Sequence, residues 1–159
     1  MTTDTLYVLL RIGADRYAID AASVVEILPI VRLKEIPCAP VGVAGMMSFR
    51  GDAITVVDLS VIAVGDPTPM RLMTRIVVVR YAHDANGGDV GLLGLIVPEV
   101  MHAAHFDPNR FERMELTTDR APFLGPVLTT DEGVLQQVLI PALLNDELRN
   151  ALFRSEVAA

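Results

Sequence analysis

The sequence predicts an all-β fold made of short strands, on three observations. Short apolar runs rich in β-branched side chains recur along the chain. Clusters of Gly, Pro, Asn and Asp separate these runs at regular intervals, which is typical of β-sandwiches and barrels. Only the last segment, residues 141–153, spaces its leucines as a helix does. Because aromatic residues make up only 5% of the chain, we expect an aliphatic core.

The first two strands are expected to form a hairpin: residues 7–12 and 17–19, with a turn at 13–16. Asp20 is suited to cap a single helical turn over residues 21–23. Strand character resumes at residues 24–30, where Pro29 limits pairing to an edge strand or to a strand end.

The chain is organised around residues 36–59, where a polar and cationic break separates two apolar runs. Gly45 allows backbone conformations that are closed to other residues. Arg50 lies at the mouth of a strand expected over residues 53–57, where a guanidinium is suited to grip an anionic or planar partner. Turn chemistry alone favours an ordinary hairpin turn that carries an exposed arginine.

Residues 65–69 are the best linker candidate, because two prolines with Gly and Asp make a stiff, polar connection. The linker is expected to divide one domain, residues 6–153, into sub-lobes at residues 13–65 and 70–140. In the second half, strands are expected at residues 75–81, 90–97 and in a hairpin within 127–140, with an Asn-Gly turn in 83–89.

A C-terminal helix is expected over residues 141–153. Leu144, Leu148 and Leu152 recur every four residues, so one face of this helix packs onto the domain. Pro141 suits its first turn.

Composition excludes several classes of function. The formal net charge is −7 and Lys34 is the only lysine, which argues against nucleic acid, because phosphate binding needs clustered basic residues. One cysteine excludes an internal disulfide framework and fits a reducing cytosol. The N-terminus lacks signal-peptide features, and no apolar run approaches the roughly 20 residues that span a bilayer. We expect a cytoplasmic protein without membrane insertion.

No catalytic set, metal site or cofactor site is expected. Glu99, His102 and His105 have a spacing that could bind a metal from one face of a helix, but this segment reads as a strand end and loop. Ser48 lacks the G-x-S-x-G context of a nucleophile elbow. Cys38 is interpreted as a small buried hydrophobe.

Met46 and Met47 indicate a surface that accepts a partner helix. Methionine is adaptable filler in cores and is also over-used on such surfaces. Alternation along a strand places one of the two side chains inward and the other outward beside Arg50. A simple core strand is nearly as good an account.

Several short motifs occur in one order along nearly the whole chain. They are YAID at 17–20, VVEI at 24–27, GMMSFRG at 45–51, ITVVDL at 54–59, GLIV at 94–97 and FLG at 123–125. In this order they resemble the CheW family, the coupling proteins of bacterial chemosensory arrays. The resemblance implies two small five-stranded, SH3-like barrels packed together with a groove between them, followed by the C-terminal helix.

The resemblance also implies a function and a site. The implied protein is a non-enzymatic scaffold that links the cytoplasmic signalling tip of a chemoreceptor to the regulatory domain of a CheA-type histidine kinase. It would lie in the cytoplasm, peripheral to the inner membrane through receptor arrays. Receptor-contact roles carry over to Val24, Gly45 and Arg50. Met46, Met47 and Phe49 are candidates for the same interface.

Three departures from the family pattern indicate a divergent member. Ser48-Phe49 stands where the family usually has Asn-Leu, Pro98 where it has Asp, and residues 138–141 where it often has a Leu-Asp pair. Residues 124–127 and the tail look most like the CheW-like proteins of Wsp-type surface-sensing systems.

Two other classes of function stay open. One is a small β-barrel module that binds a ligand, an oligonucleotide or another protein, although the acidic pI and the few aromatics disfavour the nucleic-acid version. The other is a hydrolase or metalloenzyme, which would need a constellation of residues that the sequence does not show.

Overall fold

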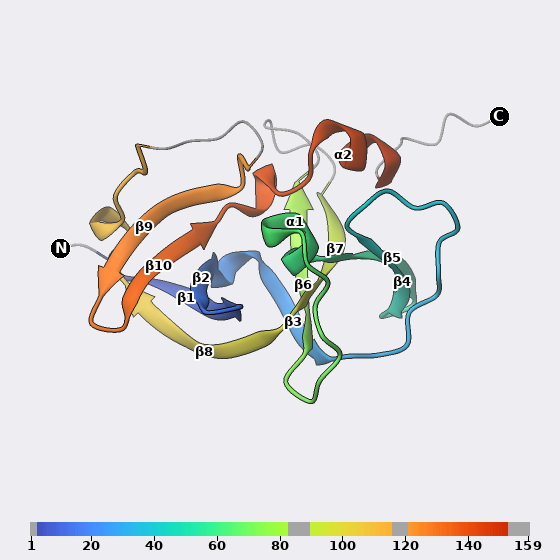
Figure 1. Ribbon diagram of the computed structural model, residues 1–159, viewed down its shortest axis with the longest axis horizontal. Coiled ribbons are helices and arrows are strands. Elements are labelled where there is room, and N and C mark those ends of the chain that lie inside the picture. The colour runs from blue at the N-terminus through green and yellow to red at the C-terminus, as the bar shows by residue number, and fades with distance from the viewer. Residues whose placement is uncertain (1–2, 83–89, 116–120, 153–159) are drawn as a thin grey trace.

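The computed structural model describes residues 3–82, 90–115 and 121–152. These residues form two five-stranded sheets, sheet A and sheet B, which lie side by side in Figure 1, with α1 near the middle of the view and α2 at its upper right. The expected all-β fold with two five-stranded units is therefore confirmed. Within the described residues, no helix is both long and apolar enough to cross a membrane.

Sheet A combines the two ends of the chain. Its strand order is β8-β1-β2-β10-β9, with β1 Thr5–Ile12, β2 Asp15–Asp20, β8 Glu99–Phe106, β9 Leu124–Thr130 and β10 Gly133–Val138. All pairings are antiparallel except β2 with β10, which is parallel.

Sheet B is built from the middle of the chain. Its order is β3-β6-β7-β5-β4, with β3 Val24–Pro29, β4 Val43–Phe49, β5 Asp52–Asp58, β6 Arg75–Ala82 and β7 Val90–Val97. The pairings repeat those of sheet A: antiparallel, antiparallel, parallel, antiparallel. The two sheets thus share one architecture, but in sheet A the central hairpin comes first in the chain.

This arrangement differs from the expected sub-lobes at residues 13–65 and 70–140. Sheet B spans both sides of the expected linker, and β1 and β2 complete a sheet whose other strands begin at Glu99. The physical reason is that strand pairing follows long-range contacts, whereas the expected boundary was placed from local turn composition.

Each sheet curls until one bridge joins its two edges. After β3 the chain crosses to β4, where Lys34 N donates to Met46 O (2.8 Å) and Met46 N to Lys34 O (2.9 Å). After β8 the chain crosses to β9, where Glu112 and Val127 exchange the same two bonds at 2.8 Å. In the described residues, neither sheet closes into a continuous barrel beyond this bridge.

The core has three layers, because central strands such as β1, β2, β6 and β7 are buried on both faces. On β6, Val77, Val79 and Tyr81 pack in a cluster shared by both sheets, whereas Ile76 and Val78 fill the interior of sheet B. A third cluster that includes Tyr7 and Leu135 fills sheet A. Alternate side chains therefore serve different layers, as the period of two along a strand requires.

The helices are short: α1 Leu59–Val64 and α2 Asp146–Leu152, with 3-10 turns at Ala21–Ser23, Pro108–Arg110 and Ile140–Ala142. Asp20 caps the first turn as expected, accepting a bond from Ala22 N at 2.9 Å. The expected helix over 141–153 is interrupted. Asn145 starts a new helix by accepting from Leu148 N at 2.8 Å, and residue 153 lies outside the described residues.

Asp58 fastens the supposed linker to sheet B. Its carboxylate accepts bonds from Ser60 N (3.0 Å), Thr68 N (2.8 Å) and Thr68 Oγ1 (2.6 Å). Asp58 and Thr68 are 7% and 4% exposed, so Thr68 anchors the otherwise exposed residues 65–69 to the domain. The Asp58 carboxylate is therefore a buried structural group at the end of β5.

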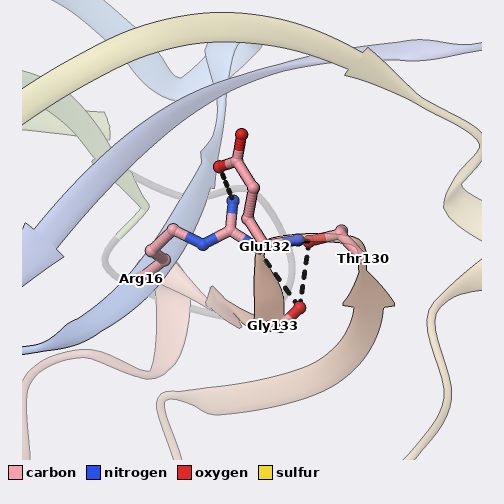
Figure 2. A network of polar contacts seen from close by, with 4 residues as sticks. All are labelled: Arg16, Thr130, Glu132 and Gly133. Atoms are coloured by element: carbon pink, nitrogen blue, oxygen red, sulfur yellow. Dashed lines mark hydrogen bonds and ion pairs between the residues drawn. The ribbon is translucent and has the colours of Figure 1, made fainter.

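Arg16 fastens the β9–β10 hairpin to β2, and Figure 2 shows its contacts. Its guanidinium donates to Glu132 (3.2 Å), to the Gly133 carbonyl (3.3 Å) and to the Thr130 hydroxyl. Arg16 is 8% exposed, although the sequence placed it in a turn. The network stabilises the only parallel pairing that sheet A has in the described residues.

We expect Asp58→Ala to lower the free energy of unfolding by about 3 kcal/mol, because it leaves buried donors at Ser60 and Thr68 without their carboxylate acceptor. Urea denaturation followed by circular dichroism measures the change. Asp66→Ala is the control, since Asp66 is exposed and should shift stability by about 0.5 kcal/mol or less. A loss in Asp58→Ala no larger than that of the control would contradict this role.

Candidate functional site

Arg50 lies at the tip of the β4–β5 hairpin. Phe49 pairs with Asp52, so Arg50 and Gly51 form a two-residue turn, with φ of 49° and 88°. Positive φ at both positions is the geometry that matches the twist of paired strands. An arginine in this conformation costs about 1 kcal/mol relative to glycine, so the turn itself would be better served by another residue.

The Arg50 side chain is oriented by two neighbours. Nη2 lies 3.3 Å from Glu26 Oε2, and the guanidinium carbon lies 4.9 Å from the centre of the Phe49 ring. The Arg50 and Glu26 side chains are 65% and 42% exposed, so the ion pair contributes about 0–1 kcal/mol to stability. The pair leaves most of the guanidinium accessible to a partner.

This ion pair also spans the opening of sheet B. Glu26 is on β3 and Arg50 follows β4, and these are the two edge strands of the sheet. Side chains that are 24 residues apart in sequence therefore meet because the sheet curls.

Gly45 lies beneath the bridge that closes sheet B. It is buried, its φ is +152°, and a Cβ at this position would lie 2.5 Å from Lys34 O and 3.0 Å from Leu33 Cβ. The family resemblance carries a receptor-contact role over to Gly45. The neighbour that approaches it here is the chain's own backbone.

The three apolar interface candidates differ in exposure. Met47 and Phe49 are 9% and 5% exposed and belong to the interior cluster of sheet B, so the expectation that they line an interface is corrected. Alternation turns their side chains inward, and the Arg50 guanidinium covers the Phe49 ring. Met46 is half-buried and carries the backbone bridge to Lys34.

Val24 begins β3 and is half-buried. It pairs with Val79 of β6 and packs against the cluster shared by the two sheets. Glu26 follows two residues later on the same strand, so Val24 lies near the ion pair along β3. Of the residues singled out from the sequence, Val24, Met46 and Arg50 therefore keep some exposed surface.

The other chemistry considered from the sequence finds no support in this geometry. Glu99, His102 and His105 lie on strand β8 and not on a helix, and no cluster of three or more metal-ligating side chains occurs among the described residues. Cys38 is exposed at a φ of 58°, which corrects the expected buried position. The Pro-rich turn that holds it lies outside the core.

Burial raises the pKa of the Tyr7, Tyr17 and Tyr81 phenols above their ordinary value of 10.0. These phenols therefore stay protonated at neutral pH. The interior of each sheet is filled by its own apolar cluster, and a ligand placed there would have to displace those side chains.

A groove of about 510 Å³ lies between the β1–β2 turn and the segment after α1. Its charged lining residues carry both signs: Arg11 and Arg71 with Asp15, Asp66 and Glu99. Apolar residues, among them Ile12, Val64 and Met73, line the rest of the groove, so it is mixed in character.

The sequence did not reveal the roles of two carboxylates. Glu26 orients Arg50, and Asp58 anchors the segment that follows α1. No spacing in the sequence predicts that Glu26 pairs with Arg50, because only the curl of sheet B brings the two side chains together. Asp58 did carry a signal, since a helix-capping residue preceded a short apolar segment that ends at Gly65.

Comparisons with known proteins agree on the fold. The family model described as CheW-like domain matches residues 6–148. The crystal structure of the scaffolding protein TtCheW from Thermoanaerobacter tengcongensis superposes with a TM-score of 0.79 at 23% sequence identity, over 93% of this chain and 92% of that one. At this identity the structural likeness establishes the fold alone. A comparison with curated proteins finds no match.

We expect Gly45→Ala to lower the free energy of unfolding by at least about 3 kcal/mol, because the methyl group would overlap the Lys34 carbonyl at a φ that favours glycine. Gly13→Ala is the matched control. Its φ is +62°, but no atom lies within 4 Å of the added carbon, so it should cost about 1 kcal/mol. Equal losses in chemical denaturation would refute the steric role.

Proposed function

Because this chain belongs to the CheW-like domain family, we propose that it is a non-enzymatic coupling protein in a chemosensory array. One partner is the cytoplasmic signalling tip of a chemoreceptor, and the other is the regulatory domain of a CheA-type histidine kinase. In this proposal the protein works in the cytoplasm, and the receptors that it binds hold it next to the inner membrane. We also propose, from residues 124–127 and the tail, that it belongs with the CheW-like proteins of Wsp-type surface-sensing systems.

The observation that supports a receptor site best is the position of Arg50. Its guanidinium is held at the tip of a turn by Glu26 and Phe49, yet 65% of the side chain is exposed. A turn that accepts about 1 kcal/mol of backbone strain to present an arginine is better explained by binding than by stability. In this proposal Arg50 contacts the receptor directly, Val24 and Met46 add apolar surface, and Gly45 acts indirectly by keeping sheet B closed.

The proposed mechanism is positional. The protein holds receptor and kinase in one assembly, and a receptor state that binds the interface with a different affinity shifts the kinase between its active and inactive arrangements. We expect the kinase contact to be apolar and to lie at a sheet end. No reacting group is required in this mechanism, in agreement with the packed interiors of both sheets.

The first experiment mixes the purified protein separately with a receptor signalling-tip fragment and with a kinase regulatory domain from the same genome. Isothermal titration calorimetry should give micromolar affinity for both partners. Binding to the kinase domain alone would contradict receptor coupling and indicate a kinase-associated array component. Binding to neither would overturn the proposal and favour a protein-interaction module of another kind.

We expect Arg50→Asn to weaken receptor-tip binding at least tenfold while leaving stability unchanged or slightly raised. Asparagine adopts positive φ more readily than arginine and makes the turn Asn-Gly, so the hairpin is preserved while the guanidinium is lost. Titration against the receptor fragment and thermal melting measure the two effects.

Arg110→Asn, at an exposed arginine in the Pro108–Arg110 turn that follows β8 of sheet A, is the control for loss of one positive charge. Full receptor binding by Arg50→Asn would remove Arg50 from the interface. A fall in the melting temperature of about 4 °C or more would show instead that Arg50 is structural.

A further inference from the structure

The segment between α1 and β6 exposes large apolar side chains. Met70, Leu72 and Met73 are 62%, 96% and 54% exposed. In Figure 1 this segment is the green loop that projects beyond the lower end of sheet B. Three neighbouring apolar side chains facing water carry a hydration cost that a binding partner would relieve.

The loop is firmly held, so this exposure does not result from loose structure. Thr74 is fully buried, and its hydroxyl donates to Pro69 O (2.6 Å) and accepts from Arg71 N (3.0 Å). Thr74 N donates to Arg71 O (3.1 Å), and Arg75 Nη1 donates to Thr74 O (2.9 Å). These bonds satisfy polar groups of the loop within the loop itself and leave the apolar side chains facing outward.

A shallow depression of about 710 Å³ lies beside these side chains. Its lining, which we call the 70–75 face, consists of Pro29, Ile30, Met70, Arg71, Leu72, Thr74 and Arg75. The lining contains two arginines and no carboxylate, in a chain with 20 acidic and 13 basic residues. Arg71 has no ion pair among the described residues. The lining of this face is therefore apolar and positively charged, while Asp15, Asp66 and Glu99 lie in the separate groove that Arg71 also lines.

We propose that the 70–75 face docks an amphipathic helix whose apolar ridge is flanked by Asp and Glu. Charge complementarity with Arg71 and Arg75 selects the acidic flanks, and the adaptable Met70 beside Leu72 suits a helix ridge. A strand is disfavoured, because the loop bonds its own backbone groups and Pro29 ends β3. An anionic membrane is disfavoured by the net charge of −7.

This surface is separate from the proposed receptor site. In the β3–β6 pair, Val24 lies opposite Val79 and Pro29 lies opposite Arg75. The two sites are thus at opposite ends of β3, roughly 17 Å apart at the rise of a strand. The inference goes beyond the proposed coupling function and does not require Arg50 to bind a receptor.

The test uses two synthetic helical peptides that share a leucine ridge at i, i+3, i+4 and i+7. One carries Glu and the other Lys on both flanks of the ridge. We expect fluorescence anisotropy to show that the full chain binds the Glu peptide at least tenfold more tightly than the Lys peptide. Leu72→Asp and Arg71→Glu should each weaken binding of the Glu peptide at least tenfold. Both side chains are exposed, so neither change should unfold the protein.

Val41→Asp is the matched control, because Val41 is 86% exposed but lies outside the 70–75 face. It should leave peptide binding unchanged. Leu72→Asp should also leave receptor-tip affinity unchanged, so failure of this inference is distinguishable from failure of the coupling function.

Three results would overturn the inference. The first is no binding of the Glu peptide, or equal binding of both peptides. The second is co-sedimentation of the protein with anionic phosphatidylserine vesicles that Leu72→Asp abolishes, which would assign the face to a membrane. The third is a self-associated species in sedimentation velocity that Leu72→Asp dissociates, which would assign the face to a second copy of the chain.

Discussion

The structure depends on closing each curled sheet with one pair of backbone hydrogen bonds. Lys34 bridges to Met46 in sheet B, and Glu112 bridges to Val127 in sheet A. In both sheets the chain leaves one edge strand and returns to the opposite edge. A five-stranded sheet that closes in this way encloses a small apolar interior and covers edge groups that would otherwise invite aggregation. The remaining faces then pack against each other as one shared core.

The same closure positions the candidate receptor site. The Glu26–Arg50 pair joins the two edges of sheet B on the solvent side, at a distance that exists only when the sheet is curled. Gly45 makes the curl possible at Lys34, where a side chain would meet the backbone. Site and fold are therefore linked through one turn and one glycine. Loss of binding in a Gly45 variant would reflect a change in the fold, whereas loss of binding in an Arg50 variant would reflect a change in the surface.

Local features were predictable from the sequence, and long-range ones were not. The Asp20 cap and the hairpin after Phe49 follow from residue chemistry over a few positions. The membership of sheet A does not, because β1 pairs with β8, which begins at Glu99, and β2 pairs with β10, which begins at Gly133, and no local pattern encodes these contacts. Helix α1 was missed because its apolar, partly β-branched sequence resembles a strand. Phe49 was misplaced because the turn beside it looked polar.

Both sheet interiors are filled by apolar side chains, so specificity has to come from the outside of the molecule. On a protein with a net charge of −7, an arginine on an exposed turn or loop stands out electrostatically. Arg50 and Arg71 each sit beside surface that is partly apolar, one supported by Phe49 and the other by Met70 and Leu72. Charge of this kind speeds the encounter with an acidic partner and rejects basic ones, while the adjacent apolar surface sets how long the complex lasts. Two such positions at opposite ends of β3 suit a protein whose work is to hold different partners at fixed places on one rigid body.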